Sequence, residues 1–411
     1  MKALRFVWLG FIFSVLGLLN PQPYRPQVNS LSAPDTVFLP RLLAEKAPHL
    51  QSYIRAASTY RIQILYTQVN RDAHNRPILK HYALRMDTTE YFYPASLVKL
   101  PMALLALERI ERLKGQGITV RTPFVLSRGK TGCFAEVPKE PYSLADCIRR
   151  QMVFSDNPTY DYLYALVGPM HATHLLHQRG YRSAYFGHRL SRSCSPQENL
   201  CVEAITFLKA NGATYTIPAT CTEERLPHPY ERHPYLFTPY ANALSLKDAH
   251  KILIGVIFPQ VLRPSERFQI SSDAYHLMRR YLSMYPSEAR DPDYDLREYH
   301  DGIRKYFLMG GSDSVPLPPR IRIFNKVGMA YGYLADVAYI VDFDLGVEFF
   351  LSAVIYIGEG KPGTPSAQGY PWSHGLHFLR ELGWVIYRYE TARKRPYFPD
   401  LSGFRYEYKR P

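Results

Sequence analysis

Three short groups of polar residues in this 411-residue chain could together perform nucleophilic catalysis. Ser96 precedes Lys99 by three positions at the start of an apolar stretch, Ser-Asp-Asn occupies 155–157, and Lys-Val-Gly occupies 326–328. A serine hydroxyl is a weak nucleophile until a neighbouring base takes its proton. Because positions i and i+3 share one face of a helix, the amine of Lys99 can reach the hydroxyl of Ser96.

Burial is what would turn Lys99 into a base. A lysine at the start of an apolar helix loses the hydration of its charge, so its pKa falls toward the range useful for proton transfer. Simpler interpretations stay open from the residues alone: Lys99 as a surface lysine, 155–157 as an ordinary helix end, and Lys326 as a solvated strand residue. The occurrence of all three groups in one order, each in its required local context, favours a hydrolase site.

Hydrophobic periodicity predicts the elements that must hold these groups. Alternating residues in 60–69 and 78–87 predict a hairpin, and 320–328, 334–343 and 347–357 predict three more strands in a meander. Residues 186–240 show little periodicity and are predicted to be an elaborated loop region. Strands from both chain ends would meet in one sheet, with the intervening helices as a second lobe. The predicted helices are 41–57, the stretch opened by Ser96, 142–157, 158–167, 169–180, 245–257, 272–285 and 374–389.

These groups, in this order, resemble those of serine β-lactamases and penicillin-binding proteins, and most closely the class A β-lactamase-like serine hydrolases. The similarity is strongest over 58–185 and 240–390. It implies an α+β fold: an antiparallel sheet of about five strands from both chain ends, with flanking helices, plus an all-helical lobe. That is the element order predicted above from periodicity.

No cofactor or metal is expected, because His171, His174 and His177 have no carboxylate or cysteine nearby to complete a ligand set.

The resemblance also implies a role for each residue. The implied roles are Ser96 as nucleophile, Lys99 as its base or proton relay, Ser155 as proton donor to the leaving group, Asn157, Lys326 and Gly328 as substrate-binding residues, and the backbone N–H groups of Ser96 and Met329 as the oxyanion hole.

The sequence departs from the family pattern at two places. Val327 stands where the family carries Thr or Ser, so a hydroxyl donor to a substrate carboxylate is missing. The loop that begins near Arg189 contains no E-x-x-L-N sequence, whose Glu activates the deacylating water in class A enzymes. Glu198 and Glu203 are candidates without the correct spacing, so an acyl-enzyme is expected to form and then persist.

The function expected first is β-lactam hydrolysis through an acyl-enzyme on an amide or ester bond, with antibiotic resistance as its consequence. The second is a D,D-peptidase or esterase-like penicillin-binding enzyme with slow deacylation. A third, from another class, is a non-catalytic protein that binds cell-wall peptide. The expected partner is a small-molecule or peptide substrate, and the expected state is a monomer.

The N-terminus predicts export. Lys2 and Arg5 precede an apolar run of 14 residues, 6–19, which suits a signal peptide and is short for a membrane span. The expected location is periplasmic or secreted, and an uncleaved N-terminus could instead attach the protein to a membrane. The expected divisions are 1–20 signal peptide, 21–57 leader and N-terminal helix, 58–390 catalytic domain with a loop insertion near 186–240, and 391–411 C-terminal tail.

Charge and cysteines complete the expectation. The net charge of +14 is dispersed along the chain and no nucleic-acid motif occurs, so anionic envelope polymers are favoured over nucleic acid. Export permits disulfides, and the odd count of five cysteines leaves one free thiol. Spacing suggests Cys133 with Cys147 and Cys194 with Cys201, although sequence alone does not fix the pairing.

Overall fold

An antiparallel five-stranded sheet separates the two larger hydrophobic cores of the protein. The computed structural model describes residues 33–127, 133, 141–314, 316–358 and 369–408. The strand order is β2-β1-β11-β10-β9, and Gln63 near the start of the chain pairs with Val354 near its end. The predicted α+β architecture is therefore confirmed, including the sheet built from both chain ends. The strands are β1 (Gln63–Arg71), β2 (Pro77–Leu84), β9 (Ile321–Ala330), β10 (Tyr333–Asp342) and β11 (Val347–Tyr356).

Alternation along each strand divides the side chains between the two cores. In β10, Val337 and Tyr339 pack with the helical lobe, whereas Leu334 and Ala338 pack on the opposite face. All ten residues of β10 are buried, as expected for a central strand covered on both sides.

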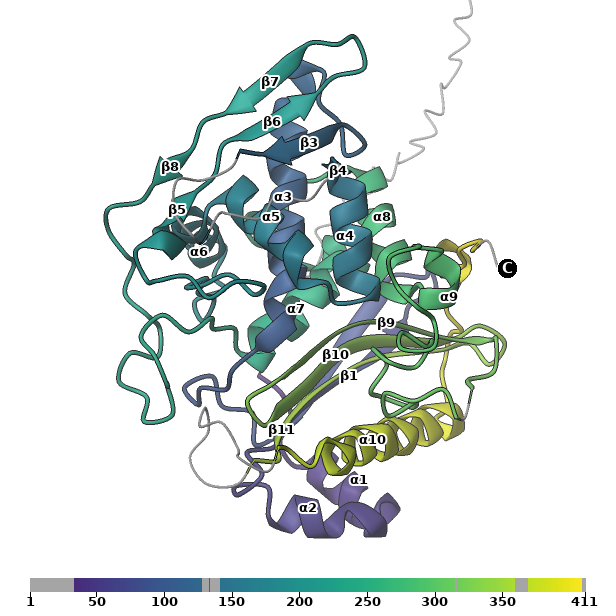
Figure 1. Ribbon diagram of the computed structural model, residues 1–411. Helices are drawn as coiled ribbons and strands as arrows, with labels where there is room; N and C mark the ends of the chain where they lie inside the picture. Colours follow the sequence, from purple (N-terminus) through teal and green to yellow (C-terminus); the bar gives the residue numbers. More distant parts are fainter. Residues whose placement is uncertain (1–32, 128–132, 134–140, 315, 359–368, 409–411) are drawn as a thin grey trace, which may run out of the picture.

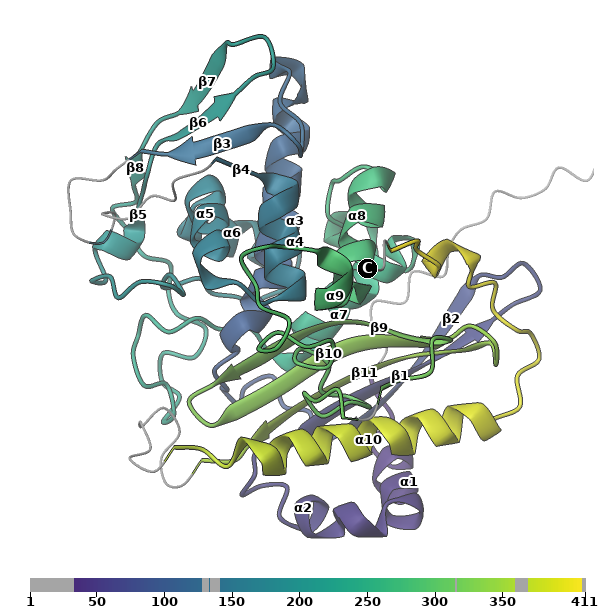
Figure 2. The same ribbon diagram turned by 45° about the vertical axis from the view of Figure 1, so that its right-hand side comes forward.

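Helices cover both faces of the sheet (Figures 1 and 2). The long helix α10 (Trp372–Ala392) lies along one face, accompanied by α1 (Phe38–Lys46) and α2 (Gln51–Arg55). The other face carries α7 (Leu246–Ile257) and α8 (Ser272–Ser283), and beyond them the rest of the helical lobe. The lobe packs on the sheet through α7, which contacts β10 and β11, and through α8, which contacts the edge strand β9.

The central helix of the lobe carries Lys99 at its first position. It is apolar on nearly all sides, with Leu100, Met102, Leu104 and Leu107 all buried, which is typical of a helix surrounded by others. Ser96 lies just before it in a 3-10 turn rather than in the predicted continuous helix. The lobe helices not yet given are α3 (Lys99–Leu113), α4 (Leu144–Val153), α5 (Asn157–Val167), α6 (Pro169–Gln178) and α9 (Pro286–Ala289).

Side-chain caps fix where several of the lobe helices begin. Ser143 caps α4 by accepting a hydrogen bond from the backbone of Asp146, whose carboxylate in turn accepts one from the backbone of Ser143. Gly168, at φ 86°, allows the sharp turn from α5 to α6. The 3-10 turns are η1 (Pro48–Leu50), η2 (Ala95–Val98), η3 (Lys114–Gln116), η5 (Glu198–Leu200), η6 (Pro259–Val261), η7 (Pro264–Glu266) and η8 (Ser402–Phe404).

The region expected to be a loop contains strands. Within 186–240, a hairpin joins two short strands from earlier in the chain into a sheet of order β4-β3-β6-β7, seen beside α3 in Figure 1. The strands are too short to give a periodic signal and owe their pairing to partners about 80 residues away. They are β3 (Pro123–Leu126), β4 (Tyr142–Ser143), β6 (Ile205–Leu208) and β7 (Thr214–Ile217), with β5 (Cys201–Val202) pairing β8 (Thr220–Cys221) separately.

The suggested disulfide pairing is wrong. Cys133 bonds to Cys194 and Cys201 bonds to Cys221, so neither cysteine pair nearest in sequence is used. Cys147 is the free thiol, buried inside α4 where no other cysteine reaches it. The prediction of one unpaired cysteine is confirmed.

The chain ends differ in what the structure describes. The apolar run 6–19 and the expected cleavage region lie outside the described residues. Among helices of the described part, none is long and apolar enough to cross a membrane. After α10 the chain returns to the lobe side of the sheet, where Leu401 and Phe404 are buried in the core that the lobe shares with the sheet.

Candidate active site

The structure brings Ser96 and Lys99 together. The Nζ atom of Lys99 donates a hydrogen bond to the Oγ atom of Ser96 over 2.8 Å, and the lysine is fully buried. Ala95, just before the serine, has a φ of 45°, in the left-handed region that costs a non-glycine residue of order 1 kcal/mol. The turn formed by residues 94–98 therefore holds Ser96 at the start of α3 in a strained but fixed position.

The Ser-Asp-Asn group approaches Lys99 from the junction of α4 and α5. Asn157 is the first residue of α5, and its Oδ1 atom accepts a hydrogen bond from Lys99 Nζ over 2.6 Å. Ser155 adopts a left-handed φ of 62° and presents both its backbone carbonyl and its hydroxyl to Lys99 Nζ. Asp156 caps α5 through the backbone N–H of Thr159 at 2.7 Å. The helix cap thus sets the position of both polar side chains beside the lysine.

Lys326 reaches the same serine from the sheet. Its Nζ atom donates to Ser155 Oγ over 2.9 Å and to the backbone carbonyl of Val327 over 3.1 Å. Gly328 permits the close approach of β9 to the turn before Ser96, because a Cβ there would lie only 2.4 Å from the carbonyl oxygen of Pro94. Met329 follows on the edge strand, next to that turn.

Val327 is buried on the opposite face from Lys326. Its side chain packs in the core that faces α10, whereas Lys326 lies toward the lobe. Val327 therefore contributes an apolar side chain to the hydrophobic core, at the position where the family carries a hydroxyl.

Electrostatics favour the neutral form of both lysines. Burial lowers the pKa of Lys99 to about 7, Asp156 opposes that shift, and the cation of Arg304 adds to it. The pKa of Lys326 is lowered well below its usual range, first by burial and then by the charges of Lys99 and Arg304. Two buried amines that share one hydroxyl partner, Ser155, cannot both carry a charge cheaply.

Two charged residues near these groups were not predicted from the sequence. Arg304 donates from Nε to the carbonyl of Phe154, one residue before Ser155, over 3.2 Å. Asp161 lies one turn beyond Asn157 in α5, and its charge raises the pKa of Lys99. Arg304 sits in a stretch without periodicity, so nothing in the sequence marks it; the i+4 spacing from Asn157 to Asp161 was the available signal for the second.

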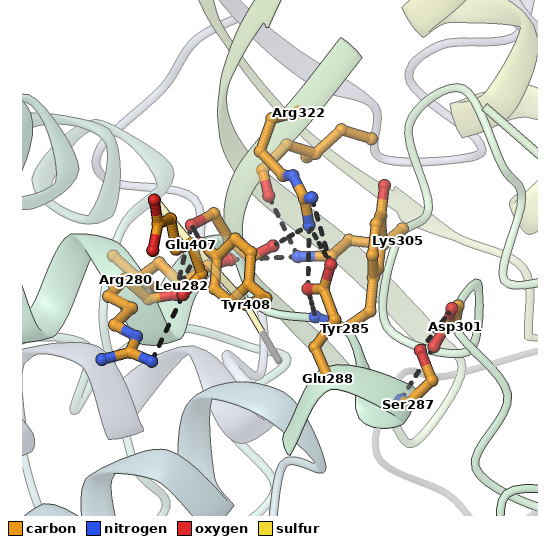
Figure 3. Close-up of polar contacts among 12 residues, drawn as sticks. Arg280, Leu282, Tyr285, Ser287, Glu288, Asp301, Lys305, Arg322, Glu407 and Tyr408 are labelled. Atoms are coloured by element: carbon orange, nitrogen blue, oxygen red, sulfur yellow. Dashed lines mark hydrogen bonds and ion pairs between the residues drawn. The ribbon is translucent and has the colours of Figure 1, made fainter. Parts of the chain in front are cut away.

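A third buried lysine supports the strand beneath the site. Lys305 Nζ donates to two backbone carbonyls at 3.0 Å and to Asn325 Oδ1 at 2.7 Å, and burial lowers its pKa to about 7. Figure 3 shows it beside the ion pair of Arg322 with Glu288, in which two carboxylate oxygens face the guanidinium. The positive charge of Lys305 is one of several charges that lower the pKa of Lys326.

The loop after α6 holds the two candidate carboxylates. Glu203 forms a buried ion pair with Arg189 at 2.8 Å, and the guanidinium of Arg192 lies 3.8 Å from the same carboxylate. Glu198 accepts a hydrogen bond from the backbone N–H of Ser195 at 2.8 Å. The carboxylates therefore bind groups of their own loop, and Glu203 in particular is held by a guanidinium inside it.

An aromatic cavity opens beside the nucleophile turn. It has a volume of about 500 Å³ and is lined partly by the loop 188–199. Tyr93, three residues before Ser96, and Tyr331, two after Met329, place their rings 5.0 Å apart, and Phe237 lies 5.0 Å from Tyr331. The cavity therefore adjoins the candidate site, next to the segments that carry Ser96 and Met329.

The three histidines of α6 make no metal site. The Nε2 atom of His177 lies 2.8 Å from the carbonyl of Ala184, and His174 contacts Gln178. In the part of the chain with described coordinates, no group of three His, Cys, Asp or Glu side chains could hold a metal ion.

Comparison with known proteins gives one family match and several solved structures of low identity. The sequence matches the Beta-lactamase enzyme family over residues 49–280. A search of curated proteins gave no match. A solved β-lactamase from Sphaerobacter thermophilus has a TM-score of 0.46 at 13% identity, covering 84% of this chain and 98% of that one. A class A β-lactamase representative from Bacteroides cellulosilyticus gives 0.47 at 10%, covering 85% and 99%, and PBP-A gives 0.46 at 13%, covering 84% and 96%.

The family match begins in η1 and ends in α8, so it includes both Ser96 and Ser155. It spans more than half of the 411 residues. The chain belongs to the Beta-lactamase enzyme family, and it is a serine hydrolase of that family.

Proposed function

We propose that this protein is an exported enzyme that opens β-lactam rings by acylating Ser96. One observation carries the proposal: the buried amine of Lys99, with a pKa lowered to about 7, lies 2.8 Å from the Ser96 hydroxyl. A neutral amine at that distance can take the hydroxyl proton as the oxygen attacks a carbonyl carbon. The hydrogen bonds from Lys99 to Ser155 and Asn157 hold the amine in that position.

The proton path follows the hydrogen bonds of the site. As Ser96 Oγ bonds to the carbonyl carbon, its proton passes to Lys99 Nζ. Lys99 lies 3.3 Å from Ser155 Oγ, so that hydroxyl can receive a proton and give its own to the leaving nitrogen as the amide bond breaks. Lys326 orients Ser155 from the other side. The backbone N–H groups of Ser96 and Met329 would stabilise the oxyanion, each worth about 2.7–4 kcal/mol.

A cation near the site suits a substrate that carries a carboxylate. Arg304, whose charge acts on both Lys99 and Lys326, supplies positive charge without the hydroxyl that Val327 lacks. The aromatic rings of Tyr93, Phe237 and Tyr331 suit an aromatic or apolar acyl group. A benzyl-substituted penicillin combines both features.

Slow deacylation is the second proposal, and one contact favours it. The carboxylate of Glu203 is engaged by the Arg189 guanidinium, so it is poorly placed to activate a water molecule. In that case the enzyme behaves as a D,D-peptidase or esterase-like penicillin-binding enzyme whose acyl form persists. A non-catalytic protein that binds cell-wall peptide is the outcome if no acyl form appears.

Export and a periplasmic or secreted location are part of the proposal. Two disulfides support them, because such bonds persist in oxidising compartments. The protein would act as a monomer on a small-molecule or peptide substrate, with no nucleic-acid partner. Membrane attachment through an uncleaved N-terminus is compatible with this.

Intact-mass spectrometry after exposure to benzylpenicillin tests the proposal. We expect a mass increase equal to one penicillin molecule, absent in Ser96→Ala and strongly slowed in Lys99→Met. Turnover of a chromogenic cephalosporin separates β-lactam hydrolysis from a persistent acyl form, and a peptide ending in D-Ala-D-Ala tests the peptidase. No adduct and no turnover with any of these substrates would refute the hydrolase and leave the binding protein.

A further inference from the structure

A second, larger cavity lies away from the serine, and the charged residues among its lining are mainly cations. Its volume is about 750 Å³, and it is bounded by the start of α7, the residues after α6, and the loop 229–234. Asp248 is the one carboxylate among its described lining residues. The cationic lining residues are Arg182, Arg232, Lys247, Lys251 and Arg263.

The two acids closest to these cations have partners of their own. Lys251 and Arg263 share the single carboxylate of Glu266, and the Lys251 Nζ distance is 2.8 Å. The carboxylate of Asp248 is buried and accepts hydrogen bonds from the hydroxyl and the backbone N–H of Ser183. The carboxylate of Glu266 is therefore engaged by its own two cations, and the single charge of Asp248 acts on Lys247 and Lys251 without forming an ion pair with Arg182 or Arg232.

Three cations are left to face the cavity. Within the described ranges, Arg182, Arg232 and Lys247 take part in no ion pair with an acidic residue. Arg182 and Arg232 are exposed at its rim and Lys247 is half-buried. Like charges gathered around a concave surface raise the local positive potential, and a bound anion relieves their repulsion.

The cavity wall is fixed by hydrogen bonds between distant segments. Tyr230 donates from its hydroxyl to the carbonyl of Thr88 over 3.0 Å, and the Tyr91 backbone N–H donates to His233 over 3.2 Å. Ser183 and Ser245 hydroxyls meet at 2.9 Å on the opposite side. A preformed wall lowers the ordering cost of binding.

We propose that this cavity binds a multivalent anion: a flexible chain bearing closely spaced phosphate or carboxylate groups, as in anionic envelope polymers. Its volume exceeds that of a single phosphate and falls within the range of ligand sites. Arginine forks match both phosphate and carboxylate oxygens. Nucleic acid fits less well, because Tyr230 is buried with its hydroxyl engaged and the ring of His233 already packs against Tyr91 and Tyr230.

Titration calorimetry on the full-length protein tests the site, with inorganic tripolyphosphate and a short poly-glutamate as probes. We expect the wild type to bind at least one probe at low ionic strength, with affinity falling as salt is added. The triple variant Arg182→Gln, Arg232→Gln, Lys247→Gln should bind about ten-fold more weakly or worse. The tighter of the two probes identifies the anionic group.

A matched control keeps the change in net charge equal. Arg112→Gln, Arg388→Gln and Lys394→Gln neutralise three exposed cations outside the cavity, and binding should stay within about two-fold of wild type. Acylation of Ser96 should be unchanged in both triple variants, which verifies folding. If the cavity triple misfolds, Arg182→Gln and Arg232→Gln singly should each weaken binding. Absence of wild-type binding to both probes, or an equal loss in the control triple, would overturn the proposal.

Discussion

The rate of Ser96 acylation should depend on pH through the amine of Lys99. The proposed reaction needs that amine neutral, and its pKa is lowered to about 7. The neutral fraction is then about one in a hundred at pH 5 and nearly complete above pH 8. We therefore expect the acylation rate to rise about a hundred-fold between those values, with its midpoint near pH 7.

Stopped-flow mixing with a chromogenic cephalosporin measures this rate in the first turnover, before deacylation matters. The enzyme should be held at neutral pH and brought to the test pH only at mixing, so that slow acid unfolding does not lower the apparent rate. A rate independent of pH down to 5, or one that still rises near pH 10, would refute the role given to Lys99.

The variant Arg304→Gln sharpens the test. The charge of Arg304 lowers the pKa of Lys99, so its removal should move the midpoint of the profile to higher pH. A purely structural role of Arg304 would reduce the rate at every pH and leave the midpoint unchanged. The direction of the shift therefore separates the electrostatic explanation from a folding defect.

Three further outcomes follow from other contacts. Lys326→Met should lower the acylation rate by about 10²–10⁴ with little loss of stability, measured by first-turnover kinetics and melting, and an unchanged rate would contradict its role. Burial lowers the pKa of His81 to about 4 and of His250 to about 3, so these two residues bind more protons in the unfolded chain below about pH 6.5. Their contribution to stability should be complete above that pH and fall by about 4 kcal/mol at pH 5, as urea unfolding would show, whereas equal stability at both pH values would contradict it. Glu203→Gln leaves the buried Arg189 charge uncompensated and should cost about 3 kcal/mol, and an unchanged urea midpoint would refute the importance of that pair.

Local sequence patterns predicted the parts of the fold whose partners are near in sequence or strongly periodic. The meander β9-β10-β11 and the capped start of α4 follow from alternation and from Ser143, and both are confirmed. The contacts among Ser96, Lys99 and Asn157 were expected because the spacing of their groups matches a known family. The chemical roles of these three residues remain predictions.

Several other features that depend on distant partners were not predicted. Cys133 bonds to Cys194 across 61 residues, and only the folded chain brings them together. The strand β6 is four residues long and is stabilised by pairing with β3 rather than by its own sequence. Arg304 approaches Lys99 because of how the segment before β9 packs under α4, which no local pattern records.

The buried thiol of Cys147 offers a readout of motion in the helical lobe. Burial raises the pKa of this thiol, so a thiol-specific reagent cannot modify it while α4 stays folded. The other four cysteines are oxidised and silent toward such a reagent. Labelling kinetics of the unmodified protein would therefore report how often α4 detaches, and with it the Ser-Asp-Asn segment that the helix leads into, without any engineered probe.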